Sequence, residues 1–543
     1  MRYGRHMRVR PGVKRLWWLW PTAGLLVAAA VLFAFHVFPF SPAILTPYPV
    51  PAITANAPQD TPAHSASPAA SPAASPVTSP NASPTASPDP NTPPGKPLGA
   101  PNTRYELAAE LHPSYDRLYA KLRVLYENTT PDTLYELVFH LYPNAYASAD
   151  GPGAQEAGGK RNFDAGRVIV SAVSLNGEIA YFTVSEDGML LHVPLVKELS
   201  PGENAEVFIE FAVDIPERDA RLGKTELGYQ LGNFLPILAV YQDGAWVTDS
   251  YASMGDPYYS ETADYAVALT YPSEYTLACT GSIVKSETGG GLTTSYAAAG
   301  KVRDFACMLS TGMQKAEDTY EGVRITSYAL SQGSADRGAA LARKALATMT
   351  PLIGSYPYET LTVAQVNMYY AGMEYPNLLM VQRELYLPGR ETELELTIAH
   401  ELIHQWFYGV VGNDEINAPW LDEAVTSYLS LAYFKQAGNE TAYDTLLARY
   451  IGERAPLGGR VDGKLSDYAS EDAYINSVYW RGAAMYHALR EEIGDDAFFN
   501  GLRTYVQDNA YRVATKADLI AAFNKACGRD LTDWFDAKLA GTA

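Results

Sequence analysis

Two histidines four residues apart, His400 and His404, enclose a glutamate in the run His-Glu-Leu-Ile-His. On a helix, residues four apart share a face, so both imidazoles could bind one zinc ion while Glu401 lies beside the remaining coordination position. With 9 histidines in the chain, such a run arises by chance on the order of once in a hundred sequences. A buried helix with two stacked histidines is the alternative interpretation. The run therefore predicts a zinc site with Glu401 as general base.

A carboxylate on the next predicted helix could complete this site. Eighteen residues separate His404 from Glu423, and Pro419 suits the first turn of the helix that carries it. Glu423 could be an ordinary surface residue, but its immediate neighbours are apolar, and an unpaired carboxylate there would be costly. Two histidines and one glutamate leave the fourth zinc position to water, whose pKa zinc lowers. Glu401 could then take the proton and return it to a leaving amine, which is the chemistry of amide hydrolysis.

This spacing resembles that of the gluzincin metallopeptidases related to aminopeptidase N. Glu374, which lies 26 residues before His400, belongs to a run Ala-Gly-Met-Glu-Tyr that is similar to the family's Gly-(Ala/Gly)-Met-Glu-Asn substrate-binding motif. The resemblance implies that Glu374 binds the free N-terminal amine, with Gly372 and Met373 in the same binding site. An anionic side chain there can hold an ammonium and so fix which peptide bond meets the metal. A capping or salt-bridged surface glutamate is the alternative.

A second motif, Tyr-Trp-Arg-Gly from Tyr479, is similar to the family's Tyr-x-Lys-Gly. The resemblance implies that Tyr479 stabilises the oxyanion of the tetrahedral intermediate, a task for which a phenol donor is suited. The neighbouring Tyr474 is the alternative. Two positions depart from the family pattern, because Tyr375 and Asp422 stand where asparagine is usual. The chain also ends where larger members continue, so we expect no further domain to cover the cleft.

The elements that position these residues fall into two halves. Apolar and polar residues alternate between about residues 103 and 315, which predicts strands, whereas steps of three and four residues after Ser334 predict helices. This α+β, multidomain pattern, together with the resemblance, implies a β-rich domain over residues 103–318 and a thermolysin-like, mainly helical catalytic domain over 319–543. The order of the halves places all the motifs in the second domain.

Composition limits the possible partners and the means of stabilisation. Hydrophobic residues make up 47% of the 543-residue chain, so most of it can bury a core. The net charge of −20 argues against nucleic acid, whose phosphates it would repel. Three cysteines cannot form a dense disulfide framework.

The N-terminus has a different composition. Residues 1–15 hold six basic and no acidic side chains, and residues 16–40 contain no charged residue. A run of this length predicts a transmembrane helix with a cytoplasmic basic tail, and a cleaved signal peptide is the alternative. Since 18 of the 36 prolines lie between residues 39 and 101, residues 41–102 are predicted to be an extended linker, or else a tail without a spacing role.

The sequence thus predicts a single-pass protein of the cell membrane with an extracellular catalytic domain. We expect a zinc aminopeptidase with one Zn²⁺ ion that removes N-terminal residues from peptides with a free N-terminus. The alternatives are a zinc endopeptidase and a catalytically silent binding protein on the same scaffold.

Overall fold

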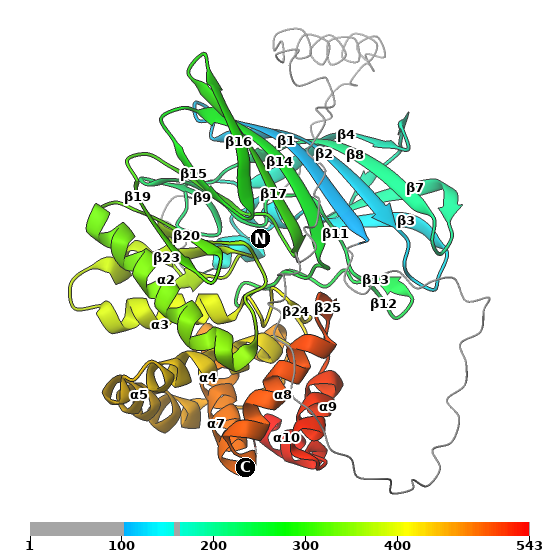
Figure 1. The fold of residues 1–543 in the computed structure, drawn as a ribbon. Helices are drawn as coiled ribbons and strands as arrows, with labels where there is room; N and C mark the ends of the chain where they lie inside the picture. Colours follow the sequence, from blue (N-terminus) through cyan, green and yellow to red (C-terminus); the bar gives the residue numbers. More distant parts are fainter. Residues whose placement is uncertain (1–101, 157–162, 542–543) are drawn as a thin grey trace, which may run out of the picture. The chain divides into compact units, whose positions relative to one another are not determined.

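The computed structural model describes residues 102–156 and 163–541. Strands dominate the first half of this region and helices the second (Figure 1). The expected order, a β-rich part followed by a mainly helical part, is confirmed. The boundary between residues 318 and 319 stays a prediction.

The largest sheet of the β-rich part has eight strands. β1 pairs in parallel with β14, and the other neighbours in this sheet are antiparallel. Buried and half-buried residues alternate along β1, β2 and β8, so that one face of the sheet forms the core, as the alternating sequence pattern predicts. In spatial order the strands are β16 (Ser282–Gly289), β17 (Leu292–Val302), β14 (Ala263–Pro272), β1 (Thr103–His112), β2 (Arg117–Glu127), β8 (Asn204–Asp214), β4 (Arg167–Leu175) and β5 (Glu178–Ile179).

Two four-stranded sheets and a short hairpin complete the β-rich part. The first sheet has the order β11 (Ile237–Leu238), β3 (Leu134–His140), β7 (Leu190–Leu199) and β6 (Thr183–Val184). The second has the order β15 (Thr276–Cys279), β18 (Cys307–Ser310), β10 (Gly228–Leu231) and β9 (Leu222–Thr225). The hairpin joins β12 (Tyr241–Gln242) to β13 (Ala245–Trp246), and the 3₁₀ turns are η2 (Tyr142–Tyr146) and η3 (Pro152–Gln155).

The second of these sheets lies between two cores. On β15, Leu277 and Cys279 belong to the core of the β-rich part, whereas Ala278 belongs to a smaller cluster. That cluster also contains Met373 and Met380 of the second half. Because successive side chains of a strand point to opposite faces, this thin sheet joins the core of the β-rich part to strands of the second half.

The second half opens with a five-stranded sheet. Its order is β19 (Gln314–Tyr320), β20 (Val323–Ala329), β21 (Thr360–Val366), β23 (Leu378–Gln382) and β22 (Gly372–Met373). β20, β21 and β23 are parallel, and β22 is a two-residue antiparallel strand at the edge. The helix α2 (Gln332–Ile353), capped by the Ser331 side chain, packs on β19 and β20.

Helices make up the rest of the chain. Every residue of α4 from Trp420 to Phe434 is buried, which makes this helix the centre of the helical part. The α-helices are α3 (Glu391–Ile403), α4 (Trp420–Gln436), α5 (Glu440–Leu447), α6 (Glu471–Tyr474), α7 (Gly482–Ile493), α8 (Asp495–Asp508), α9 (Lys516–Cys527) and α10 (Thr532–Leu539). The other elements are the 3₁₀ turns η4 (Arg383–Tyr386), η6 (Ala455–Leu457) and η7 (Leu465–Asp467), the π-helices η5 (Ala448–Arg454) and η8 (Ile475–Arg481), and the strand pair β24 (Val411–Gly412) and β25 (Arg512–Val513).

A buried arginine joins the two halves. Arg303, which follows β17, donates hydrogen bonds to the carbonyl oxygens of Tyr408 at 2.5 Å, Ser260 at 2.9 Å and Arg512 at 2.9 Å. Carbonyl acceptors from both halves thus satisfy a guanidinium that burial would otherwise make costly.

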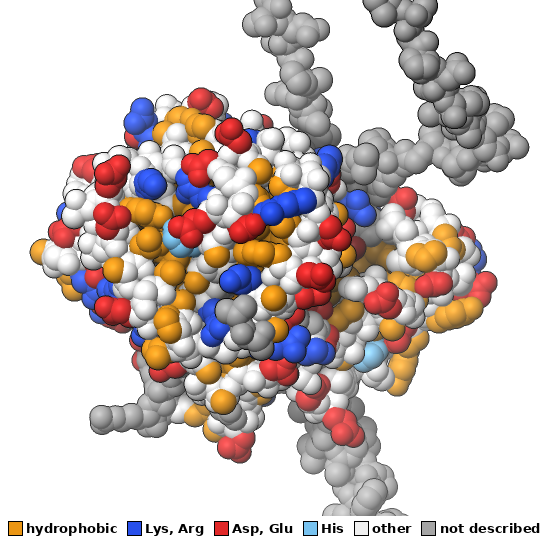
Figure 2. Space-filling view, turned by 90° about the horizontal axis from the view of Figure 1, so that it is seen from below, with side chains coloured by type: hydrophobic (Ala, Val, Ile, Leu, Met, Phe, Trp, Pro, Cys, Tyr) orange, Lys and Arg blue, Asp and Glu red, His pale blue; other side chains and the backbone are white. Residues whose placement is uncertain are grey.

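The helical face shown in Figure 2 carries acidic and basic side chains next to each other, as expected of a solvent-exposed surface. Within residues 102–156 and 163–541, no helix combines the length and apolar character needed to cross a membrane. The predicted basic tail (1–15), transmembrane helix (16–40) and linker (41–102) lie outside the described residues, apart from Asn102.

Candidate metal centre and active site

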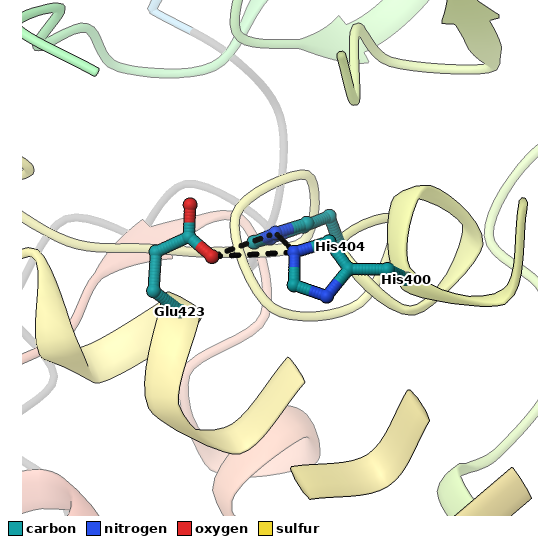
Figure 3. A group of neighbouring side chains, drawn as sticks. All are labelled: His400, His404 and Glu423. Carbon is teal, nitrogen blue, oxygen red and sulfur yellow. Dashed lines mark hydrogen bonds and ion pairs between the residues drawn. The ribbon is translucent and has the colours of Figure 1, made fainter. Parts of the chain in front are cut away.

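Two consecutive helices bring the three predicted zinc ligands together. His400 lies in the last turn of α3, His404 directly follows that helix, and Glu423 lies in the first turn of α4. One oxygen of Glu423 faces both imidazoles (Figure 3), with its Oε2 3.3 Å from His400 Nε2 and 3.4 Å from His404 Nε2. The two Nε2 atoms are 3.2 Å apart. Three potential ligand atoms therefore surround one point.

This triangle has the dimensions of a zinc site. A tetrahedron with bonds of about 2.0–2.1 Å to the metal has edges of about 3.3–3.4 Å, close to the three separations between the ligand atoms. Glu423 Oε2 is buried without a hydrogen-bond donor, as expected of an oxygen that binds a cation. Among the described residues, these three are the one group of His, Cys, Asp and Glu side chains with a metal-binding arrangement. The residues fit a zinc ion.

Neighbouring groups orient His404. Its Nδ1 lies 3.0 Å from the carbonyl oxygen of Phe407, to which it can donate, and this leaves Nε2 free for the metal. Asp422, at the position where the family has asparagine, is 3.9 Å from the same Nδ1 and accepts a hydrogen bond from Asn413 at 2.9 Å. Burial, with a further contribution from Glu423, raises the pKa of Asp422 well above its ordinary value. A protonated Asp422 can replace the usual amide without adding charge.

The ligand carboxylate is held ionised. Burial favours the neutral form of Glu423, but the adjacent His404 and His400 outweigh it and hold its pKa well below the ordinary value. Burial, in turn, lowers the pKa of His400. For His404, burial is outweighed by the charge of Glu423, which raises the pKa of this imidazole well above its ordinary value. Metal binding would therefore displace a proton from His404.

The predicted base Glu401 lies against the substrate-binding motif. A Cβ atom at position 372 would collide with the Glu401 carboxylate, so Gly372 is needed for this close approach. Burial and then the neighbouring Glu374 raise the pKa of Glu401 well above its ordinary value. A general base must accept a proton near neutral pH, and the raised pKa makes the Glu401 carboxylate a better proton acceptor there.

Glu374 follows the edge strand β22 and is 8% exposed. Burial, and then the charge of Asp256, raise its pKa to about 7. Its main chain is fixed by Gln405, the residue after His404, whose Nε2 donates to the Glu374 carbonyl at 3.0 Å. Gln405 Oε1 also accepts from the Asn377 amide at 2.7 Å. The sequence motifs did not single out Gln405, although its place beside a zinc ligand was a usable signal.

The departure at Tyr375 has a structural explanation. The Tyr375 hydroxyl donates to Asn233 Oδ1 of the β-rich part at 3.0 Å, and a Cβ at Gly232 would collide with that hydroxyl. Asn233 in turn donates to Asp304. The larger side chain is therefore accommodated by the β-rich part.

Tyr479 lies in the π-helix η8, an irregularity that often marks functional sites. Its hydroxyl donates to Glu423 Oε1 at 2.5 Å, and its ring stacks on His400 with centroids 6.1 Å apart. Burial and Glu423 raise the pKa of Tyr479 well above its ordinary value, so it remains a neutral donor. Tyr474 packs edge-on against the Tyr479 ring. The structure thus places the Tyr479 hydroxyl, of the two, on a predicted zinc ligand.

The β-rich part contributes a buried arginine beside the motif. Arg221, directly before β9, forms an ion pair with Asp256 and donates to the Gly255 carbonyl at 3.0 Å. Its Nε lies 3.4 Å from Met373 Sδ, and its guanidinium lies over the Tyr370 ring at 4.6 Å from the centroid. No local spacing in the sequence identified Arg221 or Asp256, because their partners lie far along the chain.

Comparisons with known proteins agree with this geometry. The peptidase family M1 domain matches residues 344–537. Aminopeptidase N of Lactococcus lactis subsp. lactis is 28% identical over 176 residues, which is 29% of this chain and 20% of that protein. Aminopeptidase N of Streptomyces lividans is 30% identical over 154 residues, which is 26% of this chain and 18% of that protein. The matched stretch thus spans about a fifth of each relative.

Solved structures extend the similarity of fold to both halves. The crystal structure of an M1 zinc metallopeptidase from Deinococcus radiodurans aligns with a TM-score of 0.61 at 19% identity, covering 82% of this chain and 95% of that chain. A mutant of that enzyme bound to a Tyr-Ser-Ala substrate aligns with a TM-score of 0.62 at 19% identity and the same coverage. The resemblance to aminopeptidase N-like gluzincins is confirmed, and zinc is the metal that the family implies.

Proposed function

Since this chain carries a peptidase family M1 domain, we propose that it is a zinc aminopeptidase that uses one zinc ion to remove N-terminal residues from peptides. The observation that carries the proposal is the meeting of His400, His404 and Glu423 at distances that suit zinc. Glu401, Glu374 and Tyr479 surround this cluster, as the reaction requires.

Each side chain has a separate task. His400, His404 and Glu423 would hold the zinc ion, which would provide a Lewis acid and lower the pKa of a water molecule. Glu401 takes the proton from the attacking water and passes it to the leaving amine. Tyr479 turns its hydroxyl from Glu423 to the developing oxyanion.

The requirement for a free amino terminus rests on Glu374. Glu374 is buried directly after the edge strand whose Gly372 touches the Glu401 carboxylate, so an ammonium bound there would place the first peptide bond near the metal. An endopeptidase on the same scaffold would not depend on this carboxylate. A silent binding protein would not need Glu401, whose carboxylate is retained beside the metal cluster.

Replacing the base tests the peptidase proposal. Glu401→Gln keeps the shape of the side chain but cannot accept a proton, so it should bind zinc as the wild type does and lose about 10²- to 10⁴-fold in turnover of peptide substrates. The measurements are zinc content per chain and steady-state kinetics. A variant that keeps zinc and wild-type turnover would refute the role of Glu401 and, with it, the proposed mechanism.

For the whole chain we propose a single-pass membrane protein with its catalytic domain outside the cytoplasm. The uncharged run of residues 16–40 and the basic tail before it support this location. The mature protein should fractionate with membranes and keep its first residues. The nearest Ala-x-Ala run is residues 55–57, so a mature chain that begins near Pro58 would instead identify a cleaved signal peptide.

A further inference from the structure

The thin sheet between the two cores brings two of the three cysteines together. Cys279 ends β15 and Cys307 begins β18, and the two residues are directly opposite each other in the antiparallel register. We propose that Cys279 and Cys307 form an intramolecular disulfide bond when the chain folds under oxidising conditions. This bond is independent of the proposed peptidase activity.

The hydrogen-bond pattern supports this pairing. The next opposed pair is Thr280 and Ala306, and the Thr280 amide donates to the Ala306 carbonyl at 2.9 Å. Hydrogen-bonded and non-hydrogen-bonded pairs alternate along an antiparallel ladder, so Cys279 and Cys307 occupy a non-hydrogen-bonded position. At such positions the Cα atoms are about 4.5 Å apart and the side chains approach most closely, within the range that a disulfide spans.

Both thiols also point into the same core. Cys279 and Cys307 are buried free thiols in the structure, and both belong to the core of the β-rich part. A disulfide here would replace two thiols inside an apolar cluster and would leave no new polar group without a partner.

The bond must form before the sheet closes over the thiols. Burial raises the pKa of Cys279 to about 12 and that of Cys307 well above its ordinary value, and the thiolate is the reactive form. In the unfolded chain, one thiolate attacks a small disulfide such as oxidised glutathione and releases one thiol. The second thiolate attacks the mixed disulfide and releases the other. The two cysteines are oxidised, and the small disulfide is reduced to two thiols.

The position of the bond ties it to the support of the substrate-binding strand. On the opposite face of the same two strands, Ala278, Ala306 and Met308 pack in one cluster with Met373 of β22. Thr280 and Gly281 follow Cys279, and the Gly281 amide donates to the Asn377 side chain. The disulfide would therefore restrain the layer on which the predicted amine-binding motif rests.

A thiol count on refolded protein tests the proposal. The third cysteine is removed with Cys527→Ser, and the full chain is refolded with reduced and oxidised glutathione or, in parallel, with a strong dithiol reductant. Titration under denaturing conditions should find no thiol after oxidative refolding and two after reductive refolding, and non-reducing peptide mass analysis should find the 279–307 cross-link. The bond closes a loop of about 30 residues, so the oxidised monomer should melt on the order of 5–10 °C higher than the reduced one.

Two outcomes would overturn the proposal. One is an oxidatively refolded monomer that retains both thiols, and the other is an oxidised monomer in which peptide mass analysis finds no 279–307 cross-link. The matched control, Cys279→Ala with Cys307→Ala in the same background, should melt at one temperature under both conditions. In addition, the folded reduced protein should keep both thiols in oxidised glutathione until it is unfolded, and rapid oxidation of the folded form would contradict the burial on which the order of events depends.

Discussion

The two ends of the active site are built differently. At the metal end, His400 and His404 lie at the C-terminal end of α3, and Glu423 lies in the first turn of the next helix, α4. At the amine-binding end, Glu374 directly follows a two-residue edge strand whose Met373 contacts Arg221 of the β-rich part. The difference suggests that the chemistry is encoded locally, whereas the recognition of substrate depends on contacts over long distances in the sequence.

Removing a metal ligand should have the largest effect. His404→Ala takes away one of three ligands, so zinc content should fall from about one ion per chain to near zero and peptide hydrolysis should become undetectable. Zinc analysis and kinetics measure both. Asp422→Asn is the matched control. It introduces the family's usual residue 3.9 Å from His404 Nδ1 and should keep the zinc. An inactive Asp422→Asn variant without zinc would mean that the three ligands do not hold the metal without Asp422.

Glu374→Ala should weaken binding of the substrate's free amine without affecting the metal. A substrate ammonium paired with a buried carboxylate is worth about 2–4 kcal/mol, so kcat/KM for peptides with a free amine should fall on the order of 30- to 1000-fold. Zinc content should not change. If Glu374→Ala lowered the hydrolysis of free and N-acetylated peptides by the same factor, Glu374 would not be the amine ligand.

The pH dependence of stability tests the β-rich part separately. Burial lowers the pKa of His140 to about 4, whereas in the unfolded chain it is about 6.5. The unfolded state therefore binds more protons between these values, and the stability contributed by neutral His140 is lost as the pH falls from about 6.5 towards 4. At pH 5 the loss should be about 2 kcal/mol relative to pH 7.

Other groups titrate in the same window, so the comparison is with His140→Gln, which cannot be protonated but can still donate to the carbonyl of Val247. Urea unfolding of both proteins at pH 5 and pH 7 gives the difference. His140 is also linked to the loop that carries Asp256. It stacks on Tyr142, and the Tyr142 hydroxyl accepts a hydrogen bond from the Tyr259 amide in that loop. An equal pH dependence in both proteins would show that His140 does not contribute.

Arg221→Lys tests the contact between the halves. A lysine cannot bind the Gly255 carbonyl and Asp256 while stacking on Tyr370, so the motif should be held less firmly. We expect KM to rise about tenfold while kcat and zinc content change little. Arg218→Lys is the control, since the buried Arg218 lies over the Tyr146 ring and donates to the Glu156 carbonyl. Equal changes in both variants would indicate a general loss of folding.

The smallest effect is expected at Tyr375. Tyr375→Phe removes the hydrogen bond to Asn233 and should cost about 1 kcal/mol, a fall of about 2–4 °C in the melting temperature. Tyr241→Phe removes a longer bond to Asp132, at 3.3 Å and partly exposed, and should cost less. Thermal melts of the two variants give the comparison, and an unchanged Tyr375→Phe would show that the contact with Asn233 adds no stability.

These contrasts also explain what the sequence could predict. The sequence could predict His400, His404 and Glu423, because helical spacing alone places the two histidines on one face and the glutamate lies on the next helix. It could not predict the role of Arg221, because its partner Met373 lies 152 positions further along the chain and no periodicity connects the two residues. The pairing of Cys279 with Cys307 likewise depends on a strand register that the alternating pattern does not determine.

The most direct test of the account compares one peptide with its N-acetylated copy as substrates of the zinc-loaded wild type. If Glu374 holds the free amine beside the metal centre, kcat/KM for the free peptide should exceed that for the acetylated one on the order of 30- to 1000-fold, and the first amino acid should be the product released. Equal cleavage of the two peptides, or cleavage within the acetylated chain at the same rate, would contradict the aminopeptidase proposal and identify an endopeptidase.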